Sequence, residues 1–224
     1  GSLTAAVKAA HDAGLKVVLM PAMASGAATQ GAGAAGGARE KDPYPRPLAE
    51  VAAEAQGAGV EGLCGSDLSR EPDEAYWRKA VAEVRKVYKG KVILGMAGEV
   101  VPLVTMWDAV DDMGIIGPVR LPRRLPGADL NYTVNDARVL WAAKLNEWES
   151  VGLRSGKEVM LLNMRMAADA GSLLTQPGTG SGTPPASEQQ VRETFYEGLL
   201  TETKGRAVTV GLFLPWKDEG STLT

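Results

Sequence analysis

Short apolar runs alternate with amphipathic segments along most of the chain, and residues 59–96 give the clearest example. An apolar run at 60–64 precedes a segment that starts near Pro72, and a second apolar run follows at 92–95. Proline suits the first turn of a helix because no intrahelical N–H bond is lost there. Between the two runs, four large side chains recur at the spacing of one helix face: Trp77, Val81, Val84 and Tyr88. This order predicts a strand, a helix and a parallel strand.

The same alternation continues toward both ends of the chain. It predicts six strands, at residues 17–20, 60–64, 92–95, 113–116, 159–162 and 208–213. It also predicts helices at residues 3–13, 48–58, 72–89, 134–150 and 187–203, and one further element at 103–109. Strands that alternate with helices over short connections predict a parallel α/β sheet. The chain has 224 residues, so we expect one domain over 1–224, near the lower size limit of an eight-fold (β/α) barrel.

Three stretches predict loops instead of packed elements. Residues 22–47 are rich in glycine and alanine and poor in large apolar side chains, 118–129 hold three prolines and three arginines, and 178–185 are rich in glycine, serine, threonine and proline.

Charge and composition exclude several classes of function. The formal net charge is −3 with acidic and basic residues interspersed, which argues against a nucleic-acid partner and a polybasic membrane surface. No uninterrupted apolar run reaches the roughly 18 residues of a membrane span. Cys64 is the only cysteine and lies in a predicted strand, so we expect a buried, unreactive thiol and no intrachain disulfide.

Catalysis by a metal, a histidine or a nucleotide is also disfavoured, so no cofactor is expected. His11 is the only histidine and lies on a predicted helix, where we expect a surface residue. One histidine and one cysteine are too few for a zinc site, and they do not supply a Ser-His-Asp or Cys-His arrangement. The glycines of 31–37 are not followed by a phosphate-binding lysine.

Asp67 is the first candidate for chemistry, because it follows the strand at 60–64. In parallel α/β folds the active site lies at the C-terminal ends of the strands. Two interpretations are open: Asp67 is a catalytic carboxylate, or it caps the turn that precedes the next helix.

Several segments resemble clan A glycoside hydrolases, and most closely the endo-β-mannanases of glycoside hydrolase family 113. Gly65-Ser66-Asp67-Leu68 is similar to a family strand that ends Gly-x-Glu-Leu and presents the acid/base glutamate. The segment MWDAVDDMGIIGP at 106–118 resembles the family's Phe-Trp-Asp-x-Leu-Asp-Tyr-Ile-Gly-Ile-Asn, and AAVKAAHDAGLKVVLMP at 5–21 resembles its second helix and third strand. The resemblance implies a (β/α)8 TIM-barrel-like fold in which the six predicted strands are strands three to eight. Strands one and two are then absent from this chain, and would come from residues not included in it or from another polypeptide.

The resemblance also implies an eroded catalytic site. A retaining glycosidase needs two carboxyl groups about 5–5.5 Å apart. Asp67 occupies the acid/base position but is one methylene shorter than glutamate, and Asn163 occupies the nucleophile position with a neutral amide. Trp216 matches a tryptophan that closes the family's cleft, whereas Trp107 should pack between helix and barrel. Other polar positions of the family fall on apolar or small residues here: Met20, Ala22, Ala97 or Gly98, and Ile116.

These expectations lead to two functional hypotheses. The first is a pseudoenzyme, a glycoside-hydrolase-like barrel that serves as a structural or interaction scaffold or as a weak carbohydrate-binding module. The alternative is an active endo-acting hydrolase of a β-linked polysaccharide with Asp67 as acid/base, in which Glu99, or Asp169, supplies a relocated second carboxylate. The expected partners are a polysaccharide and a polypeptide that completes the barrel. The sequon at Asn131 favours a secreted or cell-surface protein.

Overall fold

The computed structural model describes residues 2–22, 44–119, 133–166 and 188–211. Its centre is one six-stranded sheet in the order β1-β2-β3-β4-β5-β6, and every neighbouring pair is parallel. The strands are β1 (Val18–Leu19), β2 (Gly62–Asp67), β3 (Lys91–Ala97), β4 (Asp112–Val119), β5 (Val159–Met166) and β6 (Val208–Val210). All six predicted strands are confirmed, and each lies beside its predecessor in the chain.

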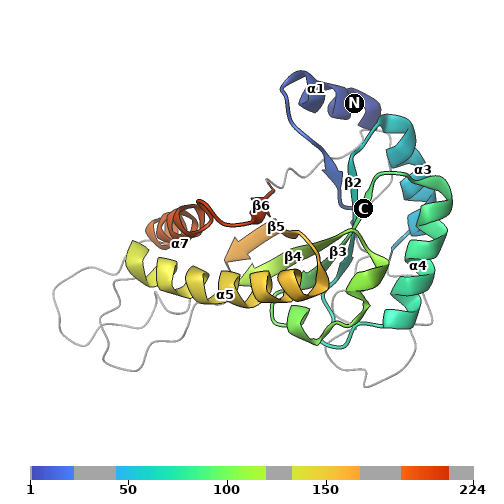
Figure 1. The fold of residues 1–224 in the computed structure, drawn as a ribbon. Coiled ribbons are helices and arrows are strands. Elements are labelled where there is room, and N and C mark those ends of the chain that lie inside the picture. The colour runs from blue at the N-terminus through green and yellow to red at the C-terminus, as the bar shows by residue number, and fades with distance from the viewer. Residues whose placement is uncertain (1, 23–43, 120–132, 167–187, 212–224) are drawn as a thin grey trace.

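Helices lie on the outer side of the sheet (Figure 1), and among the described residues an α-helix precedes every strand except β4, which follows two 3₁₀ helices. The α-helices are α1 (Leu3–Asp12), α3 (Leu48–Ala58), α4 (Glu74–Val87), α5 (Val134–Ser155) and α7 (Glu188–Glu202). The described helices form an arc from α1 through α3, α4 and α5 to α7 around the curled strands. Six consecutive parallel β/α units on a curled sheet form part of a (β/α)8 barrel, as predicted.

The sequence expectations differ from the structure in two details. The element expected at 103–109 is two 3₁₀ helices, η1 (Val101–Leu103) and η2 (Met106–Ala109), because Val104 between them has an extended backbone. The loop expected from 118 begins later, since β4 runs to Val119. The remainder of that loop and nearly all of the loops expected at 22–47 and 178–185 lie outside the described residues.

Local sequence signals fix the ends of the helices. The Asp73 side chain accepts a hydrogen bond from the Tyr76 N–H at the start of α4. Thr133 and Asp136 form a capping box at the start of α5. At the other end, α5 stops at Gly156 with a φ of 64°, a left-handed conformation that glycine adopts without steric cost.

Side chains of the central strands alternate between two apolar layers. The outer layer lies beneath the helices and includes Leu63 of β2, Leu94 of β3 and Ile115 of β4. The inner layer lies on the opposite face of the sheet, inside the curl, and its buried members are Cys64, Ile93, Ile116 and Leu162. Cys64 is buried as expected, and burial raises the pKa of its thiol to about 12.

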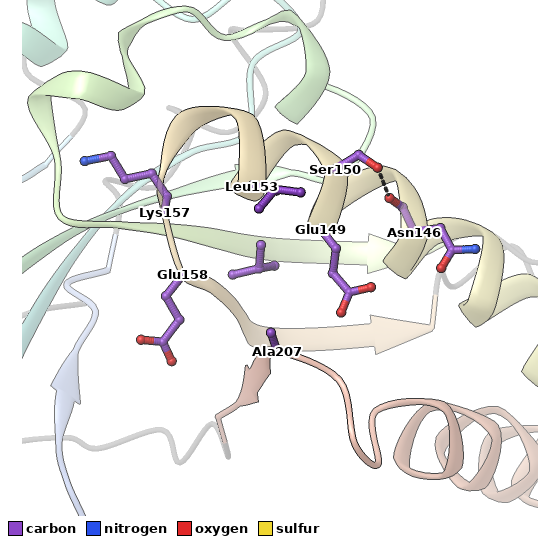
Figure 2. Close-up of a pocket in the computed structure, with 8 residues that line it drawn as sticks. Asn146, Glu149, Ser150, Leu153, Lys157, Glu158 and Ala207 are labelled. Atoms are coloured by element: carbon purple, nitrogen blue, oxygen red, sulfur yellow. Dashed lines mark hydrogen bonds between the residues drawn. The ribbon is translucent and has the colours of Figure 1, made fainter.

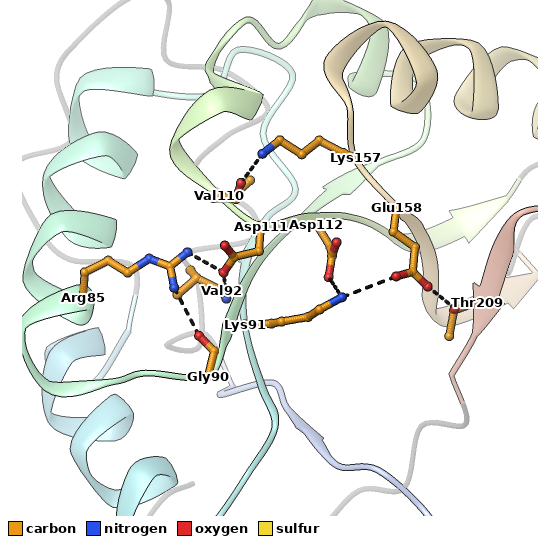
Figure 3. A network of polar contacts seen from close by, with 10 residues as sticks. All are labelled: Arg85, Gly90, Lys91, Val92, Val110, Asp111, Asp112, Lys157, Glu158 and Thr209. Carbon is orange, nitrogen blue, oxygen red and sulfur yellow. Dashed lines mark hydrogen bonds and ion pairs between the residues drawn. The ribbon is translucent and has the colours of Figure 1, made fainter.

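A network of charged side chains joins the N-terminal ends of β3, β4, β5 and β6, which form the floor of the barrel (Figure 3). The Lys91 ammonium lies 2.7 Å from a carboxylate oxygen of Asp112 and 3.4 Å from one of Glu158. The Thr209 hydroxyl donates to Glu158. This donation and the charge of Lys91 lower the pKa of Glu158 against the opposing effect of burial, and Lys16, which precedes β1, adds to the lowering.

No described helix combines the length and the hydrophobicity that a bilayer span requires.

Candidate active site

Asp67 is the last residue of β2, at the C-terminal end of the sheet where barrel enzymes hold their catalytic groups. Its side chain is completely buried, with 0% of the residue exposed. Oδ1 accepts hydrogen bonds from the Ser69 N–H at 2.9 Å and from the Ser69 hydroxyl at 2.6 Å. Oδ2 accepts a hydrogen bond from the Trp77 indole N–H at 2.7 Å. Both carboxylate oxygens are therefore engaged within the protein.

The Asp67 carboxylate points toward the helix layer. Its partner Trp77 belongs to α4 and packs on Gly65, two residues earlier on the same face of β2. A Cβ atom at Gly65 would lie 2.5 Å from the Trp77 ring, so only glycine leaves room for this packing. Cys64 lies on the opposite face, in the inner layer. The contacts of Asp67 are those of a residue that caps the turn before α4, and its catalytic role stays a prediction.

Tyr44 fixes the backbone beside Asp67. Its hydroxyl accepts a hydrogen bond from the Ser66 N–H and lies 3.3 Å from the Ser66 carbonyl oxygen, to which it donates. β1 pairs with β2 only as far as Leu63, so the Tyr44 hydroxyl occupies the position at Ser66 where a longer neighbouring strand would pair. Burial raises the pKa of this hydroxyl. The end of β2 is consequently held rigidly on both sides.

Asn163 lies in an irregular part of β5. The pairing with β4 shifts between Ile115–Leu161 and Gly117–Met164, so that Leu162 and Asn163 together oppose the single residue Ile116. Such an insertion is a β-bulge. Asn163 has a φ of 49°, a left-handed conformation that asparagine tolerates better than most residues with a side chain. Sequence reasoning missed the bulge, although an asparagine within an apolar strand is a signal for it.

The other candidate residues are distributed differently. Glu99 is exposed in the turn after β3, whereas Asp67 is buried against α4, so the proposed pair occupies two unlike environments. That Asp67 and Glu99 form a catalytic pair stays a prediction. Trp216 and Asp169 lie outside the described residues.

The remaining aromatic and histidine expectations are confirmed. Trp107 is 3% exposed and packs in the main core. His11 lies on the surface, where its Nε2 is 2.9 Å from a carboxylate oxygen of Glu61. Every described tryptophan is buried, so none of them offers an exposed platform for a sugar ring: Trp77, Trp107, Trp141 and Trp148.

The inner face carries apolar side chains and also the buried Ser66 of β2, which lies on the same face as Cys64. Met20, Leu68 and Met160 are partly buried against the inner layer, and Met160 lies at the start of β5. Within the described part of the chain, no three histidine, cysteine or carboxylate side chains are grouped as metal ligands.

A cavity of about 580 Å³ lies away from these strand ends (Figure 2). The second half of α5 and the start of β5 line it, and Ala207 closes it below Glu149. Glu149 is 2.6 Å from Arg206, and Glu158 is bound by Lys91 and Thr209, so both of its carboxylates already have partners. This cavity is therefore not the candidate active site.

The six β/α units thus define a partial (β/α)8 barrel, a class in which function depends on the groups at the strand ends. The chain belongs to glycoside hydrolase family 113, because the sequence profile described as Glycoside Hydrolase Family 113 matches residues 42–222. This match confirms the resemblance inferred from the sequence motifs.

Solved structures support the same fold. The GH113 β-mannanase AaManA from Alicyclobacillus acidocaldarius in complex with ManMIm gives a TM-score of 0.61 at 19% identity, over 96% of this chain and 66% of its own. Two structures of GH113 β-1,4-mannanase give TM-scores of 0.62 and 0.61 at 21% and 20% identity, each over 93% of this chain and 66% of theirs. A search of curated proteins found no match. The chain therefore spans 66% of the length of these mannanases, which fits a barrel without two of its strands.

Proposed function

We propose that this family 113 barrel has lost glycoside hydrolysis and serves as a scaffold or as a weak carbohydrate-binding surface. The observation that carries the proposal is the state of Asp67: its carboxylate is 0% exposed, is bound through both oxygens and is turned toward α4. A general acid must come within hydrogen-bond distance of the glycosidic oxygen. To do so, Asp67 would have to break its bonds to Ser69 and Trp77 and reach the opposite face of the sheet.

The resemblance to family 113 also implies that the second carboxylate of the reaction is missing. Asn163 carries an amide, which has no negative charge to attack the anomeric carbon or to stabilise an oxocarbenium ion. Its left-handed backbone further supports this proposal, because asparagine satisfies that conformation more easily than glutamate does. Asn163 then has a structural role, which is to allow the left-handed backbone at the bulge of β5.

Apolar side chains on the inner face are consistent with the loss of sugar chemistry. Binding sites for polar ligands place a few polar groups among apolar ones to fix the ligand's orientation. Here Met20, Leu68 and Ile116 lie on the inner face near the strand ends. These side chains offer contact to a sugar ring but no hydrogen bonds to its hydroxyl groups, so we expect weak binding or none.

An active endo-acting hydrolase of a β-linked polysaccharide is the second candidate. The family and the mannanases that share the fold favour it, and Glu99 supplies an exposed carboxylate after β3. In this alternative, Asp67 would act as acid/base with Glu99 or Asp169 as the second carboxylate.

Hydrolysis assays separate the two candidates. Purified protein should release no reducing sugar from mannan, glucan or xylan. Release at a rate that Asp67→Ala or Glu99→Gln removes, with circular dichroism unchanged, would overturn the proposal. Calorimetric titration with manno-oligosaccharides then distinguishes a weak carbohydrate-binding module, which gives heat without turnover, from a purely structural role.

A double variant tests the alignment of the site. If Asp67→Glu together with Asn163→Glu creates hydrolysis that neither single variant shows, then Asp67 and Asn163 do occupy the acid/base and nucleophile positions. Activity in the Asn163→Glu single variant alone would instead mean that Asp67 already works as an acid.

A further inference from the structure

The cavity of about 580 Å³ between α5 and the start of β5 has the size and the lining of a small-ligand site. Sites for small ligands span roughly 300–1,000 Å³ and combine apolar walls with a few polar groups. Asn146, Ser150 and Leu153 line the cavity from α5, and their spacing places them on one face of the helix. Val159 and Ala207 line it from the starts of β5 and β6 (Figure 2). The cavity therefore lies at the floor of the barrel, at the opposite end of the strands from the candidate active site.

Arg206 holds two polar side chains of this cavity in place. Its Nη1 group donates to the side-chain oxygen of Asn146 at 2.8 Å and lies 2.6 Å from a carboxylate oxygen of Glu149. The Arg206 Nε in turn donates to the carbonyl oxygen of Glu202 at 2.8 Å, so the guanidinium is itself anchored. The polar wall of the cavity is consequently ordered before a ligand arrives, and this order lowers the entropic cost of binding.

The same wall keeps hydrogen-bonding groups for a ligand. Because a guanidinium only donates, Asn146 must turn its oxygen toward Arg206, and its NH₂ group stays available as a donor. The other carboxylate oxygen of Glu149 has no partner among the described residues, and it is an acceptor. The Ser150 hydroxyl donates to the carbonyl oxygen of Asn146 at 2.7 Å and keeps lone pairs that accept. The wall therefore presents both donors and acceptors.

The charges around the cavity are balanced. Glu149 has Arg206 as its cation, and Glu158 lies 3.4 Å from the Lys91 ammonium. The Lys157 ammonium donates to a backbone carbonyl at 2.6 Å, and Figure 2 shows its side chain extending away from the other lining residues. A strongly charged ligand would consequently meet no unpaired opposite charge in this cavity.

Apolar side chains supply the rest of the lining. Val159 is 2% exposed, and Leu153 is 85% exposed at the surface of α5. A purely apolar ligand would contact both side chains but would leave the NH₂ group of Asn146 and the free oxygen of Glu149 desolvated and unpaired. The ligand that fits has an apolar face and neutral groups that both donate and accept hydrogen bonds.

We propose that this cavity is a binding site for a short neutral oligosaccharide. A sugar ring has an apolar face, which fits Leu153 and Val159, and hydroxyl groups that donate to Glu149 and accept from Asn146. The cavity contains no aromatic side chain among its lining residues, so we expect weak binding. The site goes beyond the proposed function, because it lies apart from Asp67 and does not depend on whether hydrolysis is lost.

Methyl NMR of the leucine and valine side chains tests the site. The neutral probes are manno-, cello- and xylo-oligosaccharides at millimolar concentration, and their comparison identifies the sugar. An oligogalacturonate and spermidine are the acidic and cationic probes. We expect a neutral probe to shift the signals of Leu153 and Val159 and to leave those of Leu68 and Leu162, on the inner face, unchanged. The charged probes should shift none of the four.

Three single variants, followed at the Val159 signal, locate the contacts. Leu153→Ala removes exposed apolar contact area, and Asn146→Leu removes the donor while Arg206 keeps its other partners; each should weaken binding by about fivefold. Val139→Ala is the matched control, because Val139 is 65% exposed on the same helix and does not line the cavity. It should leave binding unchanged, and an effect equal to that of Leu153→Ala would contradict the assignment.

Three results of the titrations would overturn the proposal. The first is that no neutral probe shifts Leu153 or Val159. The second is that the shifts are confined to Leu68 and Leu162, which would place sugar binding on the inner face. The third is that a charged probe binds at the cavity as tightly as the neutral ones, which would show that the ligand class is wrong.

Discussion

Charged side chains have different partners at the floor of this barrel and at its mouth, which is the C-terminal end of the strands. At the floor, Lys91, Asp112 and Glu158 pair with one another across β3, β4 and β5. At the mouth, the Asp67 carboxylate is bound by Ser69 and by Trp77 of the helix layer, and Asn163 of β5 carries a neutral amide. In barrel enzymes, the strand starts serve stability and the strand ends serve chemistry. If hydrolysis is lost as proposed, the strand ends of this chain serve stability as its strand starts do.

The largest expected effect tests whether Asp67 now serves stability. Asp67→Ala removes the acceptor of three buried hydrogen bonds, so we expect unfolding in urea to require about 3 kcal/mol less free energy. Asp67→Asn keeps one acceptor oxygen and should lose about half of that amount. Glu99→Gln is the control, since its exposed side chain should change stability by less than about 0.5 kcal/mol. If the Asp67→Ala protein is as stable as the parent, then Asp67 does not stabilise the fold.

Next in size is the ion pair at the floor. Lys91→Met leaves Asp112, whose side chain is 6% exposed, without its cation. A buried charge that loses its partner destabilises the fold, but the lysine side chain is 56% exposed and solvent screens the pair. We therefore expect a loss of about 1–2 kcal/mol. Lys89→Met, on an exposed neighbouring residue, supplies the control, and equal effects of the two variants would show that Asp112 needs no cation.

The floor should also respond to acid. Hydrogen bonding by Thr209, then the charge of Lys91, hold the pKa of Glu158 below 4.5, and the ion pair with Arg85 and the Val92 N–H hold the pKa of Asp111 below 3.8 against burial. A lowered pKa in the folded state stabilises the protein above the unfolded value, and this contribution is lost as the pH falls through the folded value. The melting temperature should thus decline as the pH drops below about 4.5, and Glu158→Gln should decline less steeply. If the melting temperatures of the parent and of Glu158→Gln fall equally with pH, then Glu158 does not contribute to the acid sensitivity.

The sequence predicted the barrel better than its mouth, for a physical reason. Strand and helix periodicity is a repeated, local signal, which located all six strands. The direction of a single side chain depends on its neighbours in space. Asp67 turns to α4 because Gly65 makes room for Trp77, and neither the motif nor the spacing indicates that packing.

The bulge at Asn163 shows where local sequence could have said more. Asparagine is depleted in strands and enriched at positive φ, so its place after an apolar run was a usable sign of irregular backbone. The resemblance to the family instead emphasises that Asn163 lacks the negative charge of a nucleophile. The two interpretations predict different behaviour for the same residue.

The smallest expected effect separates them. If backbone conformation selects Asn163, then Asn163→Gly should be neutral or slightly stabilising, while Asn163→Ala should cost about 1 kcal/mol because alanine resists a φ of 49°. Gly156→Ala, at a φ of 64° at the end of α5, calibrates the cost of the same conformation far from the mouth. Denaturant midpoints for the three variants give the comparison. Should alanine at 163 be tolerated as well as glycine, the asparagine is not retained for its backbone, and its side chain must then have a role at the mouth that the amide itself performs.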